Sequence, residues 1–325
     1  MNVLAFVLLS TLLLGALWGS ASALLYPRLR PGILAVTPTL RSLILWSWSV
    51  APLAMGAFLS PLLFVPYSPL GISHGGHCDK HPACGPHLSQ FHLPLPEGAS
   101  LPEIIALPLL GGCALFFLFQ AYTLYRGIHF RRNLRALSRN GIPGARLLSS
   151  NRPLALSVGL LRPQVFVSTA LLQGLSEEQL QVVLAHEQAH VRRRDGLRKY
   201  VAETASLLHL PRTRRLLLSD LSLATEQACD EVATRALGSR LGVAETILAV
   251  ERLMQPHGSF KTAAMACFFS NHSVARVQSL LDAGTGHTKL APLLPALPLA
   301  TVLVALVHVE HLHHGTEWLL RCLLG

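Results

Sequence analysis

The stretch that decides the fold reads Leu180-Gln-Val-Val-Leu-Ala-His-Glu-Gln-Ala-His-Val191. Its apolar residues recur with helical rather than strand spacing, so it predicts a helix. His186 and His190 are four residues apart and lie on one face of that helix, where both imidazoles can bind a single zinc ion. Glu187 is adjacent and can take a proton from a water molecule there. The alternative is a solvated helix face that carries the same pattern by chance.

A second stretch with helical patterning, residues 221–237, supplies two carboxylates. Glu226 can complete a His, His, Glu zinc site whose fourth position is left to water. Asp230 lies one turn away on the same face and can accept the free ring N–H of a ligand histidine, which fixes the tautomer of that ring. The alternative is that both carboxylates form ordinary charge pairs on an outer helix face.

Four stretches together form a more specific pattern than the two histidines alone. They are residues 155–168 (ALSVGLLRPQVFVS), 175–180 (LSEEQL), 186–195 (HEQAHVRRRD) and 226–231 (EQACDE). This combination resembles the BlaR/MecR-type membrane metallopeptidases, and the likeness covers residues 120 to 285.

The resemblance implies a multi-pass membrane protein with a cytosol-facing gluzincin domain, which cleaves a partner transcriptional repressor, often after cleaving itself. On this likeness His186, His190 and Glu226 are the zinc ligands, Glu187 is the general base, and Asp230 is the carboxylate that orients a ligand. The β-lactam receptors of the family carry a penicillin-binding sensor domain after the last membrane helix, whereas only a short tail follows it in this sequence. Antibiotic sensing is therefore not expected.

Four apolar blocks are long enough to cross a bilayer, which takes about 20 apolar residues. They are residues 3–25, 43–65, 104–125 and 291–309, and none contains Lys, Arg, Asp or Glu. Only 14% of the chain is charged, compared with about 25% in a typical soluble domain. The first block could instead be a signal peptide, because residues 20–23 resemble a cleavage site, but the basic segment that precedes such a signal is missing.

The basic residues predict the orientation of these spans. Arg28, Arg30 and Arg41 lie between the first two blocks, and a run of arginines from Arg126 to Arg139 follows the third. Among Lys and Arg residues, the loop at 66–103 contains only Lys80. Because cytoplasmic loops are enriched in Lys and Arg, we expect the N-terminus and this loop outside the plasma (inner) membrane and the long segment that follows the third block in the cytosol.

The sequence thus predicts a multi-pass α-helical membrane protein with about four spans and a cytosolic α+β, mainly helical gluzincin domain. Its expected parts are a membrane region at 1–125, a cytosolic zinc metallopeptidase domain at 126–288, and a fourth span with a short outer tail at 289–325. The net charge of +10 then reflects topology and attraction to anionic lipid. No nucleic-acid-binding motif accompanies it, so direct nucleic-acid binding is not expected.

Within the cytosolic segment, residues 145–149 and 164–168 predict short strands, with Gly159 and Pro163 at the turn between them. Ser176 and Gln179 predict a capping box at the start of the histidine helix. Pro211 and Gly238 predict the two ends of the helix that carries Glu226. A strand beside the histidine helix could hold an extended substrate through backbone hydrogen bonds.

Several polar residues have open roles. Tyr200, His209 and Arg276 are candidates, on residue type alone, for a second electrophile in peptide cleavage. Arg192, Arg193 and Arg194 could bind an acidic substrate segment or lipid phosphates, and otherwise form a solvated turn.

The outer segments combine cysteines and histidines. Cys78 and Cys84 could form a disulfide on the oxidising side of the membrane, or remain thiols or metal ligands, whereas Cys229 and Cys267 are expected as free cytosolic thiols. A transition-metal ion could bind the outer histidines; these are His74, His77, His81, His87 and His92 in the loop and His308, His311, His313 and His314 near the C-terminus. The alternative is a polar, flexible loop.

Three functions are compatible with these features. The first is a regulatory zinc endopeptidase that receives a signal outside and cleaves a repressor inside. The second is a housekeeping membrane protease of the HtpX-like type, which degrades damaged proteins. The third is a non-catalytic metal-sensing or transport protein that retains the histidine helix without activity.

Overall fold

The structure is a computed structural model, which describes residues 3–62, 101–254 and 263–282. Three long helices carry the first three apolar blocks: α1 (Val3–Leu34), α2 (Pro38–Leu62) and α3 (Leu101–Ala136). Each contains a stretch that is long and apolar enough to cross a membrane, at Val7–Leu34, Pro38–Ser60 and Pro108–Ala136. The fourth block, the outer loop with its cysteines and histidines, and the C-terminal tail lie outside the described residues.

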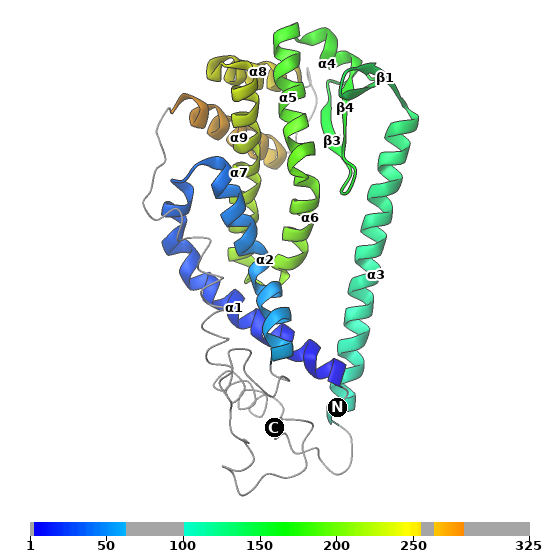
Figure 1. Ribbon diagram of the computed structural model, residues 1–325, viewed down its shortest axis with the longest axis vertical. Helices are drawn as coiled ribbons and strands as arrows, with labels where there is room; N and C mark the ends of the chain where they lie inside the picture. Colours follow the sequence, from blue (N-terminus) through cyan, green and yellow to red (C-terminus); the bar gives the residue numbers. More distant parts are fainter. Residues whose placement is uncertain (1–2, 63–100, 255–262, 283–325) are drawn as a thin grey trace, which may run out of the picture.

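Helices α1 and α2 pack closely, whereas α3 lies to one side (Figure 1). Small residues permit the close approach, since a side chain at Gly56 of α2 would collide with the backbone of Thr11 in α1. Helix α3 carries apolar side chains such as Leu115, Phe117 and Leu118 that are about two thirds exposed in the structure. An exposed apolar helix of this length is what a lipid-facing span requires.

A four-stranded sheet follows α3, with the strand order β1-β2-β4-β3. Its strands are β1 (Ser138–Ile142), β2 (Ala145–Leu148), β3 (Ala155–Val158) and β4 (Gln164–Ser168). The two predicted strands are confirmed as β2 and β4, which pair in parallel. β1 and β3 were not predicted; β1 contains Gly141 and polar residues, which disfavour a strand. The turn at 159–163 joins β3 to β4 rather than β2 to β4.

The remaining elements are helical: α4 (Thr169–Gly174), α5 (Glu177–Arg193), α6 (Asp195–Ala205), the short 3-10 helix η2 (Ser206–Leu208), α7 (Pro211–Leu237), α8 (Arg240–Met254) and α9 (Ala263–Leu281). The predicted capping box is present at the start of α5, where Ser176 and Gln179 bond to each other's backbone N–H. Both predicted ends of α7 are confirmed, because Pro211 is its first residue and Gly238 ends it with a φ of 75°.

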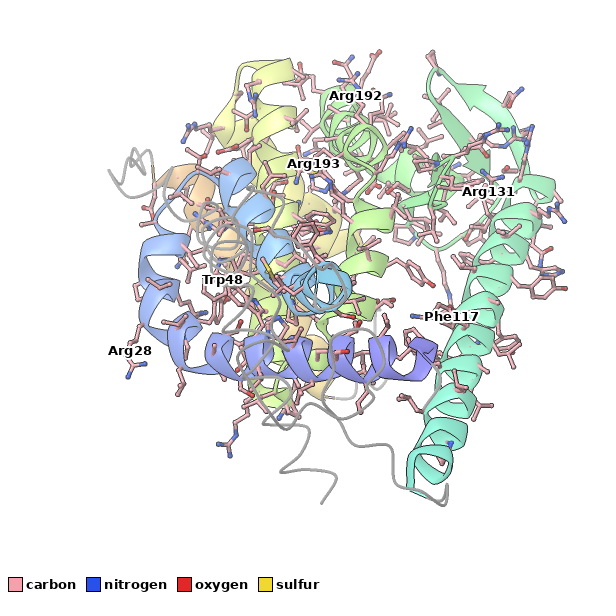
Figure 2. All side chains as sticks on the ribbon, turned by 60° about the horizontal axis from the view of Figure 1, so that its bottom comes forward. Arg28, Trp48, Phe117, Arg131, Arg192 and Arg193 are labelled. Atoms are coloured by element: carbon pink, nitrogen blue, oxygen red, sulfur yellow. The ribbon has the colours of Figure 1, made fainter. Side chains whose placement is uncertain are left out.

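The hairpin of α1 and α2 shares its core with α7. Tyr26 and Ile33 of α1, Trp48 of α2 and Leu217 of α7 are all fully or almost fully buried in one cluster. Figure 2 shows Trp48 among these helices, with Arg28 projecting outward from α1. Helix α7, which carries the carboxylates of the polar site, therefore rests directly on the first two candidate spans.

Candidate metal centre and its cleft

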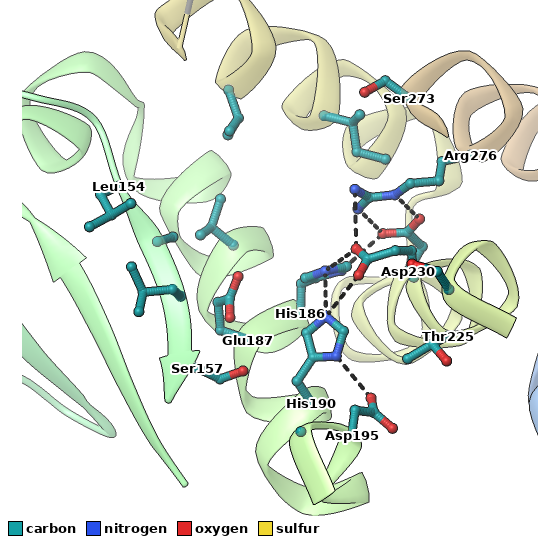
Figure 3. A pocket seen from close by; sticks show the side chains of 18 of the residues that line it. Leu154, Ser157, His186, Glu187, His190, Asp195, Thr225, Asp230, Ser273 and Arg276 are labelled. Carbon is teal, nitrogen blue, oxygen red and sulfur yellow. Dashed lines mark hydrogen bonds and ion pairs between the residues drawn. The ribbon is translucent and has the colours of Figure 1, made fainter. Parts of the chain in front are cut away.

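Three nitrogen and oxygen atoms from α5 and α7 converge at one point (Figure 3). The Nε2 atoms of His186 and His190 lie 3.2 Å apart. In the carboxylate of Glu226, Oε2 lies 3.4 Å from Nε2 of His186 and Oε1 lies 3.6 Å from Nε2 of His190. Helical spacing within α5 brings the histidines together, and the packing of α7 against α5 adds the carboxylate.

The size of this triangle fits a tetrahedral metal site. Zinc binds His nitrogen and carboxylate oxygen at about 2.0–2.1 Å, for which two ligands of a tetrahedron are about 3.3–3.4 Å apart. The three separations of 3.2, 3.4 and 3.6 Å lie around this value. Three protein ligands leave the fourth position of such a site for water or substrate.

A carboxylate holds the other side of each imidazole. Asp230 lies 2.9 Å from Nδ1 of His186, and Asp195 lies 2.8 Å from Nδ1 of His190. When both Nδ1–H groups donate to these carboxylates, the Nε2 atoms of the two neutral rings carry no hydrogen. Their lone pairs then face each other and the carboxylate of Glu226. Three acceptors that converge in this way can be stabilised by a bound cation, which is the charge that a metal ion supplies.

Asp195 is a part of the site that was not predicted from the sequence. This residue follows the end of α5, and it reaches back to His190 because Arg194 adopts a left-handed conformation with a φ of 54°. Arg193 supports it, with Nε 3.2 Å from both carboxylate oxygens, and also donates from Nη2 to the hydroxyl of Ser42 on α2 over 2.9 Å. The motif HEQAHVRRRD contains Asp195, but helical periodicity of the motif does not predict that Asp195 contacts the ring of His190.

Of the three candidates for a second electrophile, Arg276 alone joins the site. Its guanidinium makes two hydrogen bonds to Asp230, of 2.8 and 2.7 Å, and Nη1 lies 3.4 Å from Glu226. Neither Tyr200 nor His209 is among the described residues that line the cleft. His209 instead donates from Nε2 to the backbone carbonyl of Trp48 over 3.0 Å.

The electrostatics follow from this pairing. Burial by itself would lower the pKa of His186, but hydrogen bonds to Asp230 and Glu226 outweigh it and raise the pKa to about 9. Burial would raise the pKa of Glu226 and of Asp230, yet both are lowered, in Glu226 first by the hydrogen bond with His186 and in Asp230 first by the one from Arg276. The two carboxylates are therefore ionised at neutral pH and suited to hold a cation.

Cys229 lies on the opposite side of His190, with Sγ 3.4 Å from Nδ1 of the ring and 3.4 Å from Asp195. These three residues form a second group of possible metal ligands that shares His190 with the first. Burial, followed by the charge of Asp195, raises the pKa of the thiol. Since the thiolate is the form that binds metals, this environment disfavours Cys229 as a ligand.

The convergent atoms lie in a cleft of about 1450 Å³. Its walls are β3 on one side and α8 on the other, and α2 contributes Ser42 and Trp46. Glu187 lies on the side of α5 that faces β3, close to Ser157 (Figure 3). The cleft thus brings the predicted general base, the convergent ligands and an edge strand of the described sheet to one place.

A family model described as BlaR1 peptidase M56 matches residues 103–280, which is more than half of the chain. The chain belongs to the BlaR1 peptidase M56 family. The match runs from the first turn of α3 to the last turn of α9 and includes the convergent residues His186, His190 and Glu226, so the predicted family is confirmed. No curated protein and no solved structure matches the chain significantly.

Proposed function

We propose that this M56 family member is a membrane zinc metalloendopeptidase that faces the cytosol and acts as a signal-transducing regulator. The observation that carries the proposal is the triangle of His186, His190 and Glu226, whose size fits zinc, with a carboxylate behind each imidazole. Its substrate would be a cytosolic transcriptional repressor, and also its own chain, cleaved in response to an external signal. This regulatory part rests on the family resemblance.

His186, His190 and Glu226 would hold the ion, and Zn²⁺ would supply a Lewis acid that polarises the peptide carbonyl and makes water acidic enough to ionise near pH 7. Glu187 then accepts the proton of the attacking water and returns it to the leaving amine. Asp230 and Asp195 keep both imidazoles in the tautomer that presents Nε2 to the ion.

Strand β3 would position the substrate. It lies at one end of the described sheet, bonded to β4 on one side, and it lines the cleft beside α5. A strand with a free edge can bind an extended peptide by backbone hydrogen bonds, which fits a protease that cuts looped or unfolded segments.

Arg276 is better suited to positioning than to direct catalysis. Its guanidinium is committed to Asp230 through two hydrogen bonds and also approaches Glu226. A bidentate arginine of this kind fixes the orientation of a carboxylate. We therefore assign Arg276 the role of holding Asp230 against His186.

The orientation is proposed from the arginines at the ends of the spans. Arg28, Arg30 and Arg41 lie near the junction of α1 and α2, and Arg131, Arg132 and Arg135 lie near the end of α3. Both sets are expected on the cytosolic side. Alkaline phosphatase fused near residue 150 should be inactive and near residue 85 active; the reverse pattern would contradict the orientation.

The test of the enzyme compares Glu187→Gln with His186→Ala in purified protein. Glu187→Gln should keep one zinc per chain and lose cleavage, because Glu187 is a base and not a ligand, whereas His186→Ala should lose both. Co-expression with candidate repressors should then give fragments that depend on Glu187. Cleavage of misfolded membrane proteins alone would favour a housekeeping protease, and signalling that persists in Glu187→Gln would favour a non-catalytic metal sensor.

A further inference from the structure

The turn between α6 and α7 contacts all three candidate membrane helices. Thr204 accepts a hydrogen bond of 2.9 Å from Nε2 of Gln120 in α3. Leu208 fits against Gly15 and Gly19 of α1, where any larger side chain would collide with it. His209, as described above, bonds to the backbone of Trp48 in α2. We call residues 204–215 the α6–α7 tip.

We propose that the α6–α7 tip is inserted in the lipid bilayer, so that the peptidase domain is anchored in the membrane by an element of its own fold as well as by the spans. This inference rests on α1, α2 and α3 crossing a bilayer, as in the proposed function. It goes beyond that function because residues 204–215 belong to none of the candidate spans.

The position of the tip can be measured along α1 and α3 from an exposed arginine of each helix, since an exposed arginine of a span can extend its charge to the headgroups. Gly19 is nine residues from Arg28, and Gln120 is six residues from Arg126. At 1.5 Å per helical residue these separations along the helix axes are about 13.5 and 9 Å. Because a helix that is inclined in the bilayer reaches a depth smaller than the length along its axis, both helices place the tip close to the depth of an interfacial helix, which buries its apolar face about 5–10 Å.

The exposed side chains of the tip are of the kinds found in elements that insert at the headgroup level of a bilayer. Leu207 and Leu210 are 53% and 49% exposed in the described part of the chain. Arg212 and Arg215 are exposed beside them. Long arginine side chains can extend from apolar surroundings to lipid phosphates, so this combination matches an anionic bilayer surface better than water.

Backbone groups in and next to the tip are hydrogen-bonded, as a lipid environment requires, because each unpaired carbonyl or N–H group there costs several kcal/mol. The carbonyl of Glu203, near the C-terminal end of α6, accepts hydrogen bonds from Ser206 Oγ over 3.2 Å and Arg214 Nη2 over 3.1 Å. The N–H of His209 donates to the carbonyl of Ser206 over 3.0 Å. Pro211 begins α7 without an N–H group that would need a partner.

The test places a photoreactive benzophenone amino acid at Leu207 or Leu210 in the full-length protein, reconstituted in vesicles of phosphatidylcholine and phosphatidylglycerol. Two matched positions serve as controls. Leu118 on α3 is 67% exposed and should face lipid, whereas Leu241 at the start of α8 is 59% exposed and should face water. Lipid adducts are measured by mass spectrometry after irradiation, in variants that retain bound zinc.

We expect lipid adducts at Leu207, Leu210 and Leu118, at least tenfold more abundant than at Leu241. If Leu118 forms lipid adducts but Leu207 and Leu210 form no more than Leu241, the inference about the tip is wrong, and the proposed membrane protease is unaffected. Background at Leu118 as well would overturn the membrane placement of α3 and, with it, the proposed function. The two tip positions give separate readings, so one variant that fails to fold does not decide the result.

Discussion

Arg193 Nη2 donates a hydrogen bond to the hydroxyl of Ser42 across 2.9 Å, which ties the end of the histidine helix to the first turns of α2. The same guanidinium holds Asp195, and Asp195 in turn holds the ring of His190. A candidate membrane helix is therefore connected through two side chains to a predicted metal ligand. Any displacement of α2 relative to α5 must alter or break this connection.

Ser42→Ala should reduce peptide cleavage several-fold while one zinc remains bound. The substitution removes one hydrogen bond to a charged group, which contributes about 1.5 kcal/mol, but leaves Arg193 bonded to Asp195. Cleavage rate and zinc content would be measured on the same purified protein. Ser47→Ala is the matched control, because Ser47 also lies on α2 and bonds to the carbonyl of Ile44 in its own helix. An equal loss in both variants would show that the connection to Arg193 has no special role.

Asp195→Asn and Asp230→Asn should each weaken zinc binding by about 10–100-fold, since carboxylates behind ligand histidines typically have this effect. The measurement is competition with a chelator of known affinity. Cys229→Ala should leave the affinity unchanged, because its thiol is in an environment that keeps it protonated. Unchanged affinity in Asp195→Asn would remove Asp195 from the metal site.

The parts of the site that sequence predicted are those fixed by local geometry. His186, Glu187 and His190 share one helix, and Glu226 and Asp230 share another, so helical spacing alone sets their relations within each pair. The capping box and the ends of α7 were predictable for the same reason, because they depend on residues adjacent in the chain.

The parts of the site that were not predicted depend on contacts between segments far apart in the sequence or on an uncommon backbone conformation. Asp195 reaches His190 through the left-handed conformation of Arg194, which no helical pattern encodes. Arg276 reaches Asp230 from α9, and residue type alone did not separate it from Tyr200 and His209. The contact of Ser42 with Arg193 joins helices far apart in the sequence, which requires knowledge of the packing.

Arg276→Gln should lower the free energy of unfolding by about 3 kcal/mol, the lower end of the range for a broken buried pair, because Asp230 loses Arg276 and keeps His186 as its charged partner. The expected readouts are thermal unfolding of the zinc-free protein and a parallel loss of zinc affinity. Arg235→Gln is the control, since Arg235 pairs with Glu231 at an exposed position on α7 and should change stability by less than about 1 kcal/mol. Normal stability with lost turnover in Arg276→Gln would instead indicate that Arg276 acts on the substrate.

The stability of the zinc-free protein should fall as the pH rises through about 9. The pKa of His186 is raised from its ordinary value to about 9 by Asp230 and Glu226, so the folded state binds a proton that the unfolded chain releases near pH 6.5. This contribution is fully present below pH 6.5 and is lost as the pH increases through the folded pKa. The measurement is the unfolding temperature of metal-free protein between pH 6 and pH 10. Asp230→Asn removes one source of the raised pKa and should shift the decline to lower pH. Zinc takes the place of the proton on His186, so the unfolding temperature of the zinc-loaded protein should not decrease through titration of His186. If the unfolding temperature decreases with pH equally with and without zinc, the titrating group is another residue.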